Sequence, residues 1–220
     1  MYIIMLGAQG TGKGTVAGLI SKETNYPQIS TGDIFRQNIK DKTELGIEAD
    51  KYISQGNLVP DEITVPMVTN RLSDKDAENG AILDGFPRTI EQAQKLDEIL
   101  AKGGKKVDLV INLTTPKEEL IDRMITRRVC PKCKSTFNIK LCPPKVEGIC
   151  DNCGEKLVQR EDDSNPEAIQ RRLEIYKEKT SPLVEHYKKQ GVLRTETISI
   201  SINRMANDVA KEVVEYIKNK

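Results

Sequence analysis

The chain has 220 residues, with 34 Lys and Arg against 33 Asp and Glu, and a formal net charge of +1. This balance gives no reason to expect a surface for nucleic acid or membrane. No apolar run approaches the roughly 20 residues that span a bilayer, and the first residues lack the flanks of a signal peptide, so we expect a cytoplasmic protein. The length suits one α/β domain with insertions, or two small domains.

A glycine-rich loop near the N-terminus is the strongest motif. Residues 7–15 read G-A-Q-G-T-G-K-G-T and follow the short apolar run of residues 2–6, which is typical of a buried strand. The glycines let backbone N–H groups approach a polyphosphate, and Lys13 adds a mobile cation. Gly14 departs from the usual P-loop pattern, which has a hydroxyl residue directly after the lysine; here Thr15 follows. Because residues 16–20 can open a helix, we predict a phosphate site rather than a simple glycine-rich turn.

Strands and helices are expected to alternate along the chain. Amphipathic patterns at residues 90–101 and 117–128 indicate helices between the apolar runs. This alternation predicts an α/β fold with a parallel sheet covered on both faces, whose strand ends carry the chemistry. Five segments are expected to form the strands: residues 2–6, 28–30, 81–83, 107–113 and a stretch within 193–202.

Asp84 and a set of arginines are the next candidates. Asp84 ends an apolar run, where a P-loop protein commonly holds Mg²⁺ through water; a helix cap or turn former is the alternative. On one helix Arg123 and Arg127 would face the same side. Each arginine could be a surface residue, but phosphoryl transfer needs several guanidinium groups. The candidates are Arg36, Arg88, Arg123, Arg127, Arg128, Arg160 and Arg172.

Four cysteines form two C-x-x-C pairs, which indicate a metal site rather than disulfides in a reducing compartment. They are Cys130, Cys133, Cys150 and Cys153. The spacing predicts a tetrahedral zinc site, with iron as the alternative. We expect the zinc to be structural, because it would hold together an insertion too small to own a core. The fifth cysteine, Cys142, is expected to have no role.

Taken in order, these motifs resemble the adenylate kinase family in its long form. The resemblance rests on residues 7–15, S-T-G-D at 30–33, L-D-G-F-P-R-T at 83–89, Asp122-Arg123 with Arg127-Arg128, P-P-K-V-E-G at 143–148 and R-E-D-D at 160–163. It implies a P-loop nucleoside triphosphate hydrolase-like three-layer sandwich, with a five-stranded parallel sheet and two small inserted domains. The core would comprise residues 1–29, 60–126 and 165–220. Residues 30–59 would be a nucleoside monophosphate-binding insertion and residues 127–164 a lid.

The implied activity is reversible, Mg²⁺-dependent transfer of the γ-phosphoryl group of ATP to AMP, giving two ADP. Transfer would be direct and in line under a closing lid, in a monomer whose partners are ATP, AMP and ADP. One alternative is a kinase for another nucleoside monophosphate. A second is a zinc-ribbon protein that binds nucleic acid and uses ATP as a switch, although acidic residues oppose the lysines of the cysteine-bearing insertion and no aromatic residues interleave them.

The resemblance also implies roles for matching residues. The catalytic cations would be Lys13, Arg36, Arg88, Arg123, Arg127, Arg160 and Arg172. ATP would contact Gly10, Thr11, Gly12, Lys13, Gly14, Thr15, Arg123, Arg127, Thr136 and Phe137. AMP would contact Thr31, Arg36, Asn57, Leu58, Val59, Gly85, Phe86, Pro87, Arg88, Gln92, Arg160 and Arg172, with Gln92 reading the adenine edge. Asp84 and Asp33 would support Mg²⁺. Two departures stand out: Cys142 replaces an expected asparagine, and residues 197–205 match too poorly to assign an adenine contact.

Overall fold

The computed structural model describes residues 1–200 and 204–220. Its central sheet has five strands in the order β2-β3-β1-β4-β7, and all neighbouring strands are parallel. The strands are β1 (Tyr2–Leu6), β2 (Gln28–Ser30), β3 (Ala81–Asp84), β4 (Val107–Thr114) and β7 (Leu193–Thr197). The expected five-stranded parallel sheet is therefore confirmed. Part of the range expected to hold the last strand, residues 201–203, lies outside the described residues.

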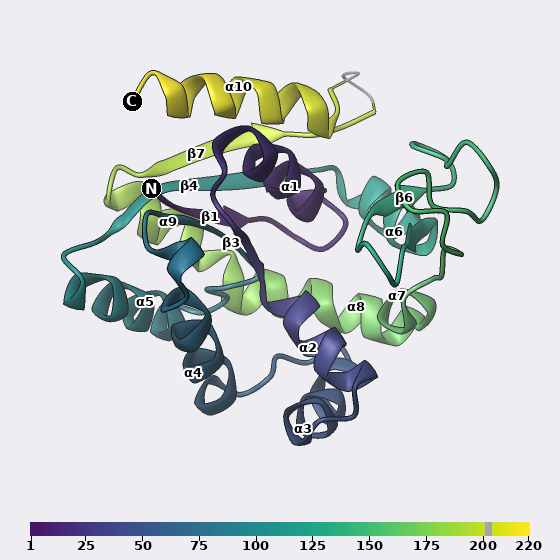
Figure 1. The fold of residues 1–220 in the computed structure, drawn as a ribbon, viewed down its shortest axis with the longest axis horizontal. Helices are drawn as coiled ribbons and strands as arrows, with labels where there is room; N and C mark the ends of the chain where they lie inside the picture. The colour runs from purple at the N-terminus through teal and green to yellow at the C-terminus, as the bar shows by residue number, and fades with distance from the viewer. Residues whose placement is uncertain (201–203) are drawn as a thin grey trace.

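Helices α1 (Lys13–Thr24) and α10 (Ala206–Lys218) cover one face of this sheet (Figure 1). The side chains of Ile3 and Met5 point to this face, where they pack with residues such as Val16 and Val213. Because side chains alternate along a strand, the remaining residues of β1 must face the opposite layer. A strand buried on both faces explains why residues 2–6 read as a continuous apolar run.

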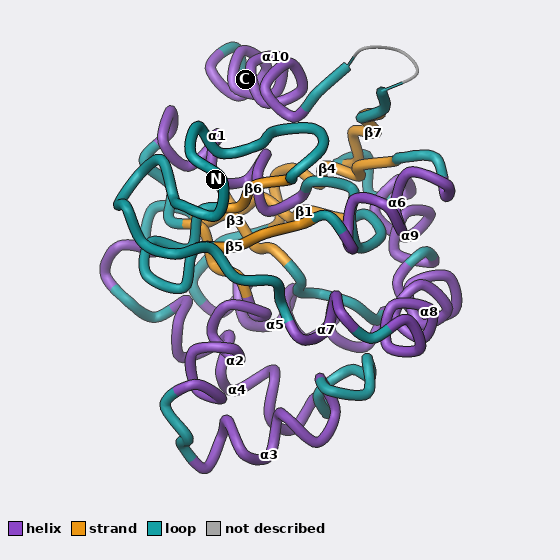
Figure 2. The backbone as a smooth tube through the Cα atoms, turned by 90° about the vertical axis from the view of Figure 1, so that its right-hand side faces the viewer, coloured by secondary structure: helices purple, strands orange, loops and turns teal. Residues whose placement is uncertain are grey.

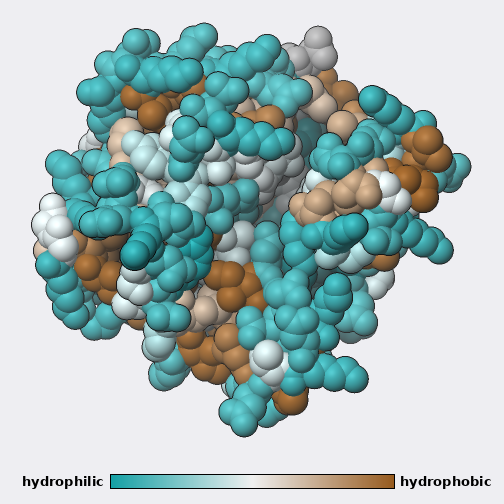
Figure 3. All heavy atoms as spheres, viewed as in Figure 1, coloured by the Kyte–Doolittle hydropathy of each residue, from teal (hydrophilic) through white to brown (hydrophobic). Residues whose placement is uncertain are grey.

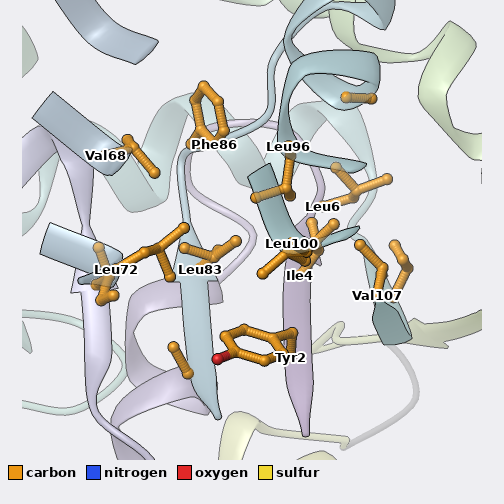
Figure 4. Close-up of a cluster of buried hydrophobic side chains, with 14 of the residues drawn as sticks. Tyr2, Ile4, Leu6, Val68, Leu72, Leu83, Phe86, Leu96, Leu100 and Val107 are labelled. Atoms are coloured by element: carbon orange, nitrogen blue, oxygen red, sulfur yellow. The ribbon is translucent and has the colours of Figure 1, made fainter. Parts of the chain in front are cut away.

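The opposite face is covered by α4 (Asp61–Leu72), α5 (Ile90–Lys102) and α9 (Pro182–Lys189). Figure 4 shows Ile4 of β1 and Leu83 of β3 close to Leu96 and Leu100 of α5, with Leu72 of α4 beside them. Figure 2 shows the sheet, in orange, between α10 above and α5 below. The two helical layers around one sheet confirm the expected three-layer sandwich. No helix among the described residues is long and apolar enough to cross a membrane.

Two stretches project from these layers. Between β2 and α4 the chain forms α2 (Thr31–Lys40) and α3 (Glu44–Ile53), and α6 (Lys117–Ile125) leads into the cysteine-bearing stretch. The latter contains an antiparallel pair of short strands and a single helical turn (Figure 2). These elements are β5 (Arg127–Val129), β6 (Thr136–Asn138) and α7 (Glu161–Ser164). The remaining elements of the chain are α8 (Pro166–Ile175), the π-helix Tyr176–Thr180 and a short 3₁₀ helix, Lys75–Ala77, between α4 and β3.

The helix expected over residues 117–128 is shorter than predicted. It ends at Ile125, and Arg127 and Arg128 lie in β5 instead. There Arg127 pairs with Asn138 of β6, and Val129 exchanges backbone hydrogen bonds with Val158. Pairing with distant segments therefore outweighs the local helical pattern. The prediction that Arg123 and Arg127 share a helix face is wrong.

Candidate active site

The glycine-rich loop follows β1 at the carboxyl edge of the sheet, where it lies very close to neighbouring backbone. Gly7, Gly10 and Gly12 have φ angles of 134°, 87° and 93°. A Cβ atom at Gly7 would lie 2.4 Å from the carbonyl oxygen of Leu113, and one at Gly10 would lie 2.8 Å from that of Leu120. Only glycine fits both the conformation and the space, so this loop shape requires the observed sequence.

Lys13 is the first residue of α1, and its side chain folds back over the loop. Its Nζ donates hydrogen bonds to the carbonyl oxygens of Gly7, at 2.7 Å, and Ala8, at 2.8 Å. Burial disfavours the charged ammonium and lowers the pKa of Lys13 to about 8, although Asp84 opposes this effect. The loop thus contains a cation close to the helix N-terminus, which is where backbone N–H groups favour anions.

Asp84 is the last residue of β3 and stands in register with Met5 of β1 and Ser30 of β2. Its carboxylate lies against the loop, since a Cβ atom at Gly14 would be 3.3 Å from Asp84 Oδ2. Burial raises the pKa of Asp84, while Lys13 acts to lower it. Glycine after the lysine leaves room for this carboxylate. The departure from the usual loop pattern at Gly14 therefore has a physical reason.

A cavity of about 900 Å³ opens at this edge of the sheet, and Figure 3 shows the surface hollowed between the sheet layers and the cysteine-bearing stretch. It is lined by most of the residues assigned to ATP, Mg²⁺ and catalysis, and by Gly85 and Pro87, which were assigned to AMP. These are Gly10, Gly12, Lys13, Gly14, Thr15, Asp33, Arg36, Asp84, Gly85, Pro87, Arg88, Arg123, Arg127, Thr136, Phe137, Arg160 and Arg172.

A second cavity, of about 70 Å³, lies against α2 and the segment before α4. Its lining includes ten of the twelve residues assigned to AMP, all except Phe86 and Pro87: Thr31, Arg36, Asn57, Leu58, Val59, Gly85, Arg88, Gln92, Arg160 and Arg172. Arg36, Arg88, Arg160 and Arg172 line both cavities. The two spaces therefore meet at a group of four guanidinium groups.

Two of the residues predicted to contact a nucleotide have side chains that line neither cavity, and the candidate Arg128 also lies outside both. Thr11 is 1% exposed, and its hydroxyl donates a hydrogen bond to the carbonyl oxygen of Ala8 at 2.8 Å. Phe86 is also 1% exposed and packs in the core between the sheet and α5. Their side chains hold the loop and the turn in place, and any contact with a ligand would fall to their backbone groups.

The arginines from the cysteine-bearing stretch and from α8 are held by two adjacent aspartates. Arg127 donates two hydrogen bonds of 2.7 Å to Asp163, and Arg160 donates to Asp162 at 2.9 and 2.5 Å. Arg172 lies 3.0 Å from Asp162 and 3.2 Å from Asp163. Burial opposes the charged form of Asp162, but Arg160 and Arg172 hold its pKa well below its ordinary value.

Sequence reasoning gave Asp162 and Asp163 no role beyond belonging to a motif. The signal that could have found them is the need for countercharge, because three partly buried arginines near one another need carboxylates close by. The same reasoning applies to Glu119, which pairs with Arg123 at 2.7 Å. Arg36 has a carboxylate that was already a candidate, since it pairs with Asp33 at 2.6 Å.

The turn after β3 joins several residues assigned to AMP. The Thr31 hydroxyl and Arg88 Nε both donate to the carbonyl oxygen of Gly85, at 3.0 and 2.9 Å. The backbone N–H of Arg88 donates to Gln92 Oε1 at 2.7 Å, and Gln92 Nε2 donates to Asp61 Oδ1 at 2.6 Å. Asp61 was not a candidate in the sequence, where it stands only as an acidic residue at a helix start.

The four predicted cysteines gather as expected, with their Sγ atoms all within 4.8 Å of one another. Each C-x-x-C pair lies in a turn closed by a backbone hydrogen bond. The N–H of Lys134 donates to the carbonyl oxygen of Cys130 at 3.0 Å, and that of Gly154 donates to the carbonyl oxygen of Cys150 at 2.9 Å. Four soft sulfur ligands in this arrangement fit the tetrahedral coordination of zinc. Cys142 is exposed and lies outside this group.

Comparisons with known proteins agree with the geometry. A family model described as adenylate kinase matches residues 5–192. An adenylate kinase of Clostridium tetani is 51% identical over 219 residues, which cover 100% of this chain and 96% of that protein. One from Caldicellulosiruptor saccharolyticus is 48% identical over 217 residues, 99% of each chain. One from Clostridium kluyveri is 49% identical over 205 residues, 93% of this chain and 94% of the other.

These matches span nearly the whole chain, and they confirm both the resemblance and the expected enzyme class. Adenylate kinases are phosphotransferases that act on nucleoside monophosphates, bind ATP, AMP and ADP, and use Mg²⁺ with ATP. The comparisons favour this activity over the nucleic-acid-binding alternative. The chain therefore belongs to the adenylate kinase family.

Proposed function

We propose that the two cavities are the two nucleotide sites of one phosphoryl transfer, with ATP phosphates in the larger and AMP in the smaller. The observation that carries this proposal is the group of four arginines shared by both cavities: Arg36, Arg88, Arg160 and Arg172. A phosphoryl group in transit needs positive charge around it, because its negative charge spreads over several oxygens. The junction of the cavities carries such charge, offset in part by Asp162, which lines both cavities and pairs with Arg160 and Arg172.

On the ATP side, the backbone N–H groups of residues 10–15 would surround the phosphates, and Lys13 would exchange its two loop carbonyls for phosphate oxygens. Arg123 and Arg127 would add charge from the neighbouring wall of the same cavity. Thr136 and Phe137 of β6 lie on that wall too and would contact the nucleotide. No side chain need become covalently attached, because an oxygen of AMP can attack the γ-phosphorus in line.

On the AMP side, Arg36 and Arg88 would hold the phosphate, and Gln92 would contact the adenine. The backbone of residues 57–59 and the turn of residues 85–87 would complete this site. Thr31 would act near the base, with its hydroxyl hydrogen directed at Gly85. The buried side chain of Phe86 gives the turn a fixed base in the core.

Asp84 and Asp33 suit a supporting role for the Mg²⁺ that accompanies ATP. Both carboxylates line the larger cavity, and carboxylate oxygens are the donors that Mg²⁺ prefers, directly or through water. When bound, the ion would neutralise part of the phosphate charge. Asp84 would in addition hold the Lys13 ammonium in its charged form, since its carboxylate acts to raise the pKa of that lysine.

Residues 30–59 and 127–164 would be two insertions that close over the nucleotides and exclude water, which is a competing acceptor. A hydrogen bond joins them, from Lys134 Nζ to Gln37 Oε1 at 2.8 Å. The four cysteines would hold a structural zinc ion that keeps the lid, residues 127–164, in shape. Both sites lie within one chain, so we propose a monomer that acts in the cytoplasm.

The test compares two arginine variants in a coupled assay with ATP, Mg²⁺ and AMP. Arg88→Ala should lower kcat, because its guanidinium lines both cavities, and should raise the KM for AMP by about 10-fold to 100-fold. The KM for ATP should change far less, because Arg88 Nε is bonded to Gly85 in the turn assigned to AMP. Arg71→Ala is the control, since Arg71 pairs with Asp76 on the surface of α4 and lines neither cavity. Equal effects on both nucleotides, or a wild-type preference for GMP, CMP or UMP, would contradict the assignment.

A further inference from the structure

Gln92 presents an amide to the smaller cavity, and that amide is held by two partners of fixed chemistry. Its Oε1 accepts from the backbone N–H of Arg88, and its Nε2 donates to a carboxylate oxygen of Asp61. Gln92 as a whole is 2% exposed, so its amide has little access to water as an alternative partner. A backbone N–H can only donate and a carboxylate can only accept. The two partners therefore determine which end of the amide is oxygen and which is nitrogen.

Rotating the amide by half a turn would be costly. Oε1 would then face the Asp61 carboxylate, and the NH₂ group would face the N–H of Arg88. Two hydrogen bonds would be replaced by two like-with-like contacts, one of them involving a full charge. Asp61 itself lines neither cavity and holds Gln92 from behind. Its place as the first residue of α4 fixes the carboxylate relative to the turn that carries Arg88.

The orientation matters because of what the amide has left to offer. A glutamine amide has two N–H donors and two acceptor lone pairs, and one of each is already used. The remaining donor and acceptor match a 6-aminopurine, whose N1 accepts and whose N6–H donates. A 6-oxopurine has the opposite pattern, with an acceptor at O6 and a donor at N1. It would match the amide only in the rotated orientation.

We propose that Asp61 is a positioning residue that makes the enzyme select 6-amino over 6-oxo purine monophosphates by fixing the Gln92 amide. This inference rests on the proposed AMP site. A simpler role for Asp61 is an acidic residue that stabilises the first turn of α4 through the helix dipole. Glu62 occupies the next position of that turn, is exposed and makes no contact with Gln92, so it separates the two roles.

The test measures kcat/KM for AMP and for inosine 5′-monophosphate, with ATP and Mg²⁺ fixed, in wild type and in Asp61→Asn, Asp61→Ala and Glu62→Gln. Asparagine at 61 can donate to a rotated amide, so only the Arg88 N–H would still oppose rotation. We expect Asp61→Asn to lower the AMP to inosine monophosphate ratio by about tenfold or more, chiefly through a higher KM for AMP. Asp61→Ala should also lower the ratio, and Glu62→Gln should preserve it.

Thermal unfolding checks that each variant is folded. If Asp61→Asn does not fold, the kinetic comparison is made with Asp61→Ala instead. A folded position-61 variant whose ratio stays within about twofold of wild type would overturn the role of Asp61, and so would an equal fall in Glu62→Gln. Gln92→Ala distinguishes a wrong role for Asp61 from a wrong location of the AMP site. If Gln92→Ala leaves the KM for AMP unchanged, the AMP site itself is misplaced and this inference falls with it.

Discussion

The sheet layers and the lid are built on different physical principles, yet both supply charge to the same cleft. The layers bury two large apolar clusters, one on each face of the sheet. The lid buries little besides Cys130, Phe137, Cys150 and Leu157. So small an apolar cluster contributes little free energy of folding, and a cross-link by metal is the usual remedy. With the proposed zinc ion bound, the active site would combine a part fixed by packing with a part fixed by sulfur ligands.

This difference suits the proposed work of each part. The glycine-rich loop needs a fixed shape, and the backbone contacts of Gly7 and Gly10 hold it to about one conformation. On the proposed function, the lid would have to move while it keeps its own shape, because Arg127 and Arg160 would have to return to the same places in each cycle. A cluster of four sulfurs provides internal rigidity without a large apolar surface that would resist opening.

The largest effect is expected on the packed side, from Lys13→Ala. Loss of the ammonium should lower kcat by about 10²-fold to 10³-fold, because this cation is the one placed inside the phosphate loop. The variant should remain folded, but its thermal midpoint should fall, because the Gly7 and Ala8 carbonyls lose a donor and the buried Asp84 carboxylate loses its countercharge. Steady-state kinetics and thermal unfolding measure the two results. Lys102→Ala, at the exposed end of α5, is the control. Near-normal turnover would remove the loop lysine from the mechanism.

A smaller effect on kcat/KM for ATP, again through Lys13 of the glycine-rich loop, is expected when the pH is raised. Burial lowers the pKa of Lys13 to about 8, while Asp84 acts to raise it and Arg88, Arg127 and Arg172 act to lower it. The cation is therefore present below about pH 8 and is lost as pH rises through that value. In the free enzyme kcat/KM for ATP should fall about tenfold per pH unit beyond it. A profile that stays flat to about pH 10 would show that the charge of Lys13 does not control ATP use.

Much of this site could be predicted from the sequence because its motifs are local. The loop, the Asp84 turn and the paired cysteines each need particular residue types at close spacing, so their chemistry is visible without a fold. The fold class followed from buried strands that alternate with amphipathic helices.

The missed features depend on partners distant in the chain. Arg127 leaves its predicted helix because β6 and Val158 pair with its strand. Asp61 reaches Gln92 across 31 positions, and Asp163 reaches Arg127 across 36. A carboxylate beside an arginine or glutamine carries no sequence pattern at such a separation. Only the packing of α4 and α7 brings these groups together.

Hydrogen exchange with and without a zinc chelator tests the contrast between the lid and the sheet layers most directly. The same measurement is made on Cys150→Ser, which removes one sulfur of the cluster, and on Cys142→Ser, the matched control from the same insertion. Chelation should speed amide exchange at Val129, Cys130 and Val158, whose backbone bonds stay within the lid, and leave Ile3 and Ile82 of the sheet protected. Cys150→Ser should reproduce this pattern, and Cys142→Ser should behave as wild type. Equal deprotection of lid and sheet, or no change in the lid, would contradict the account.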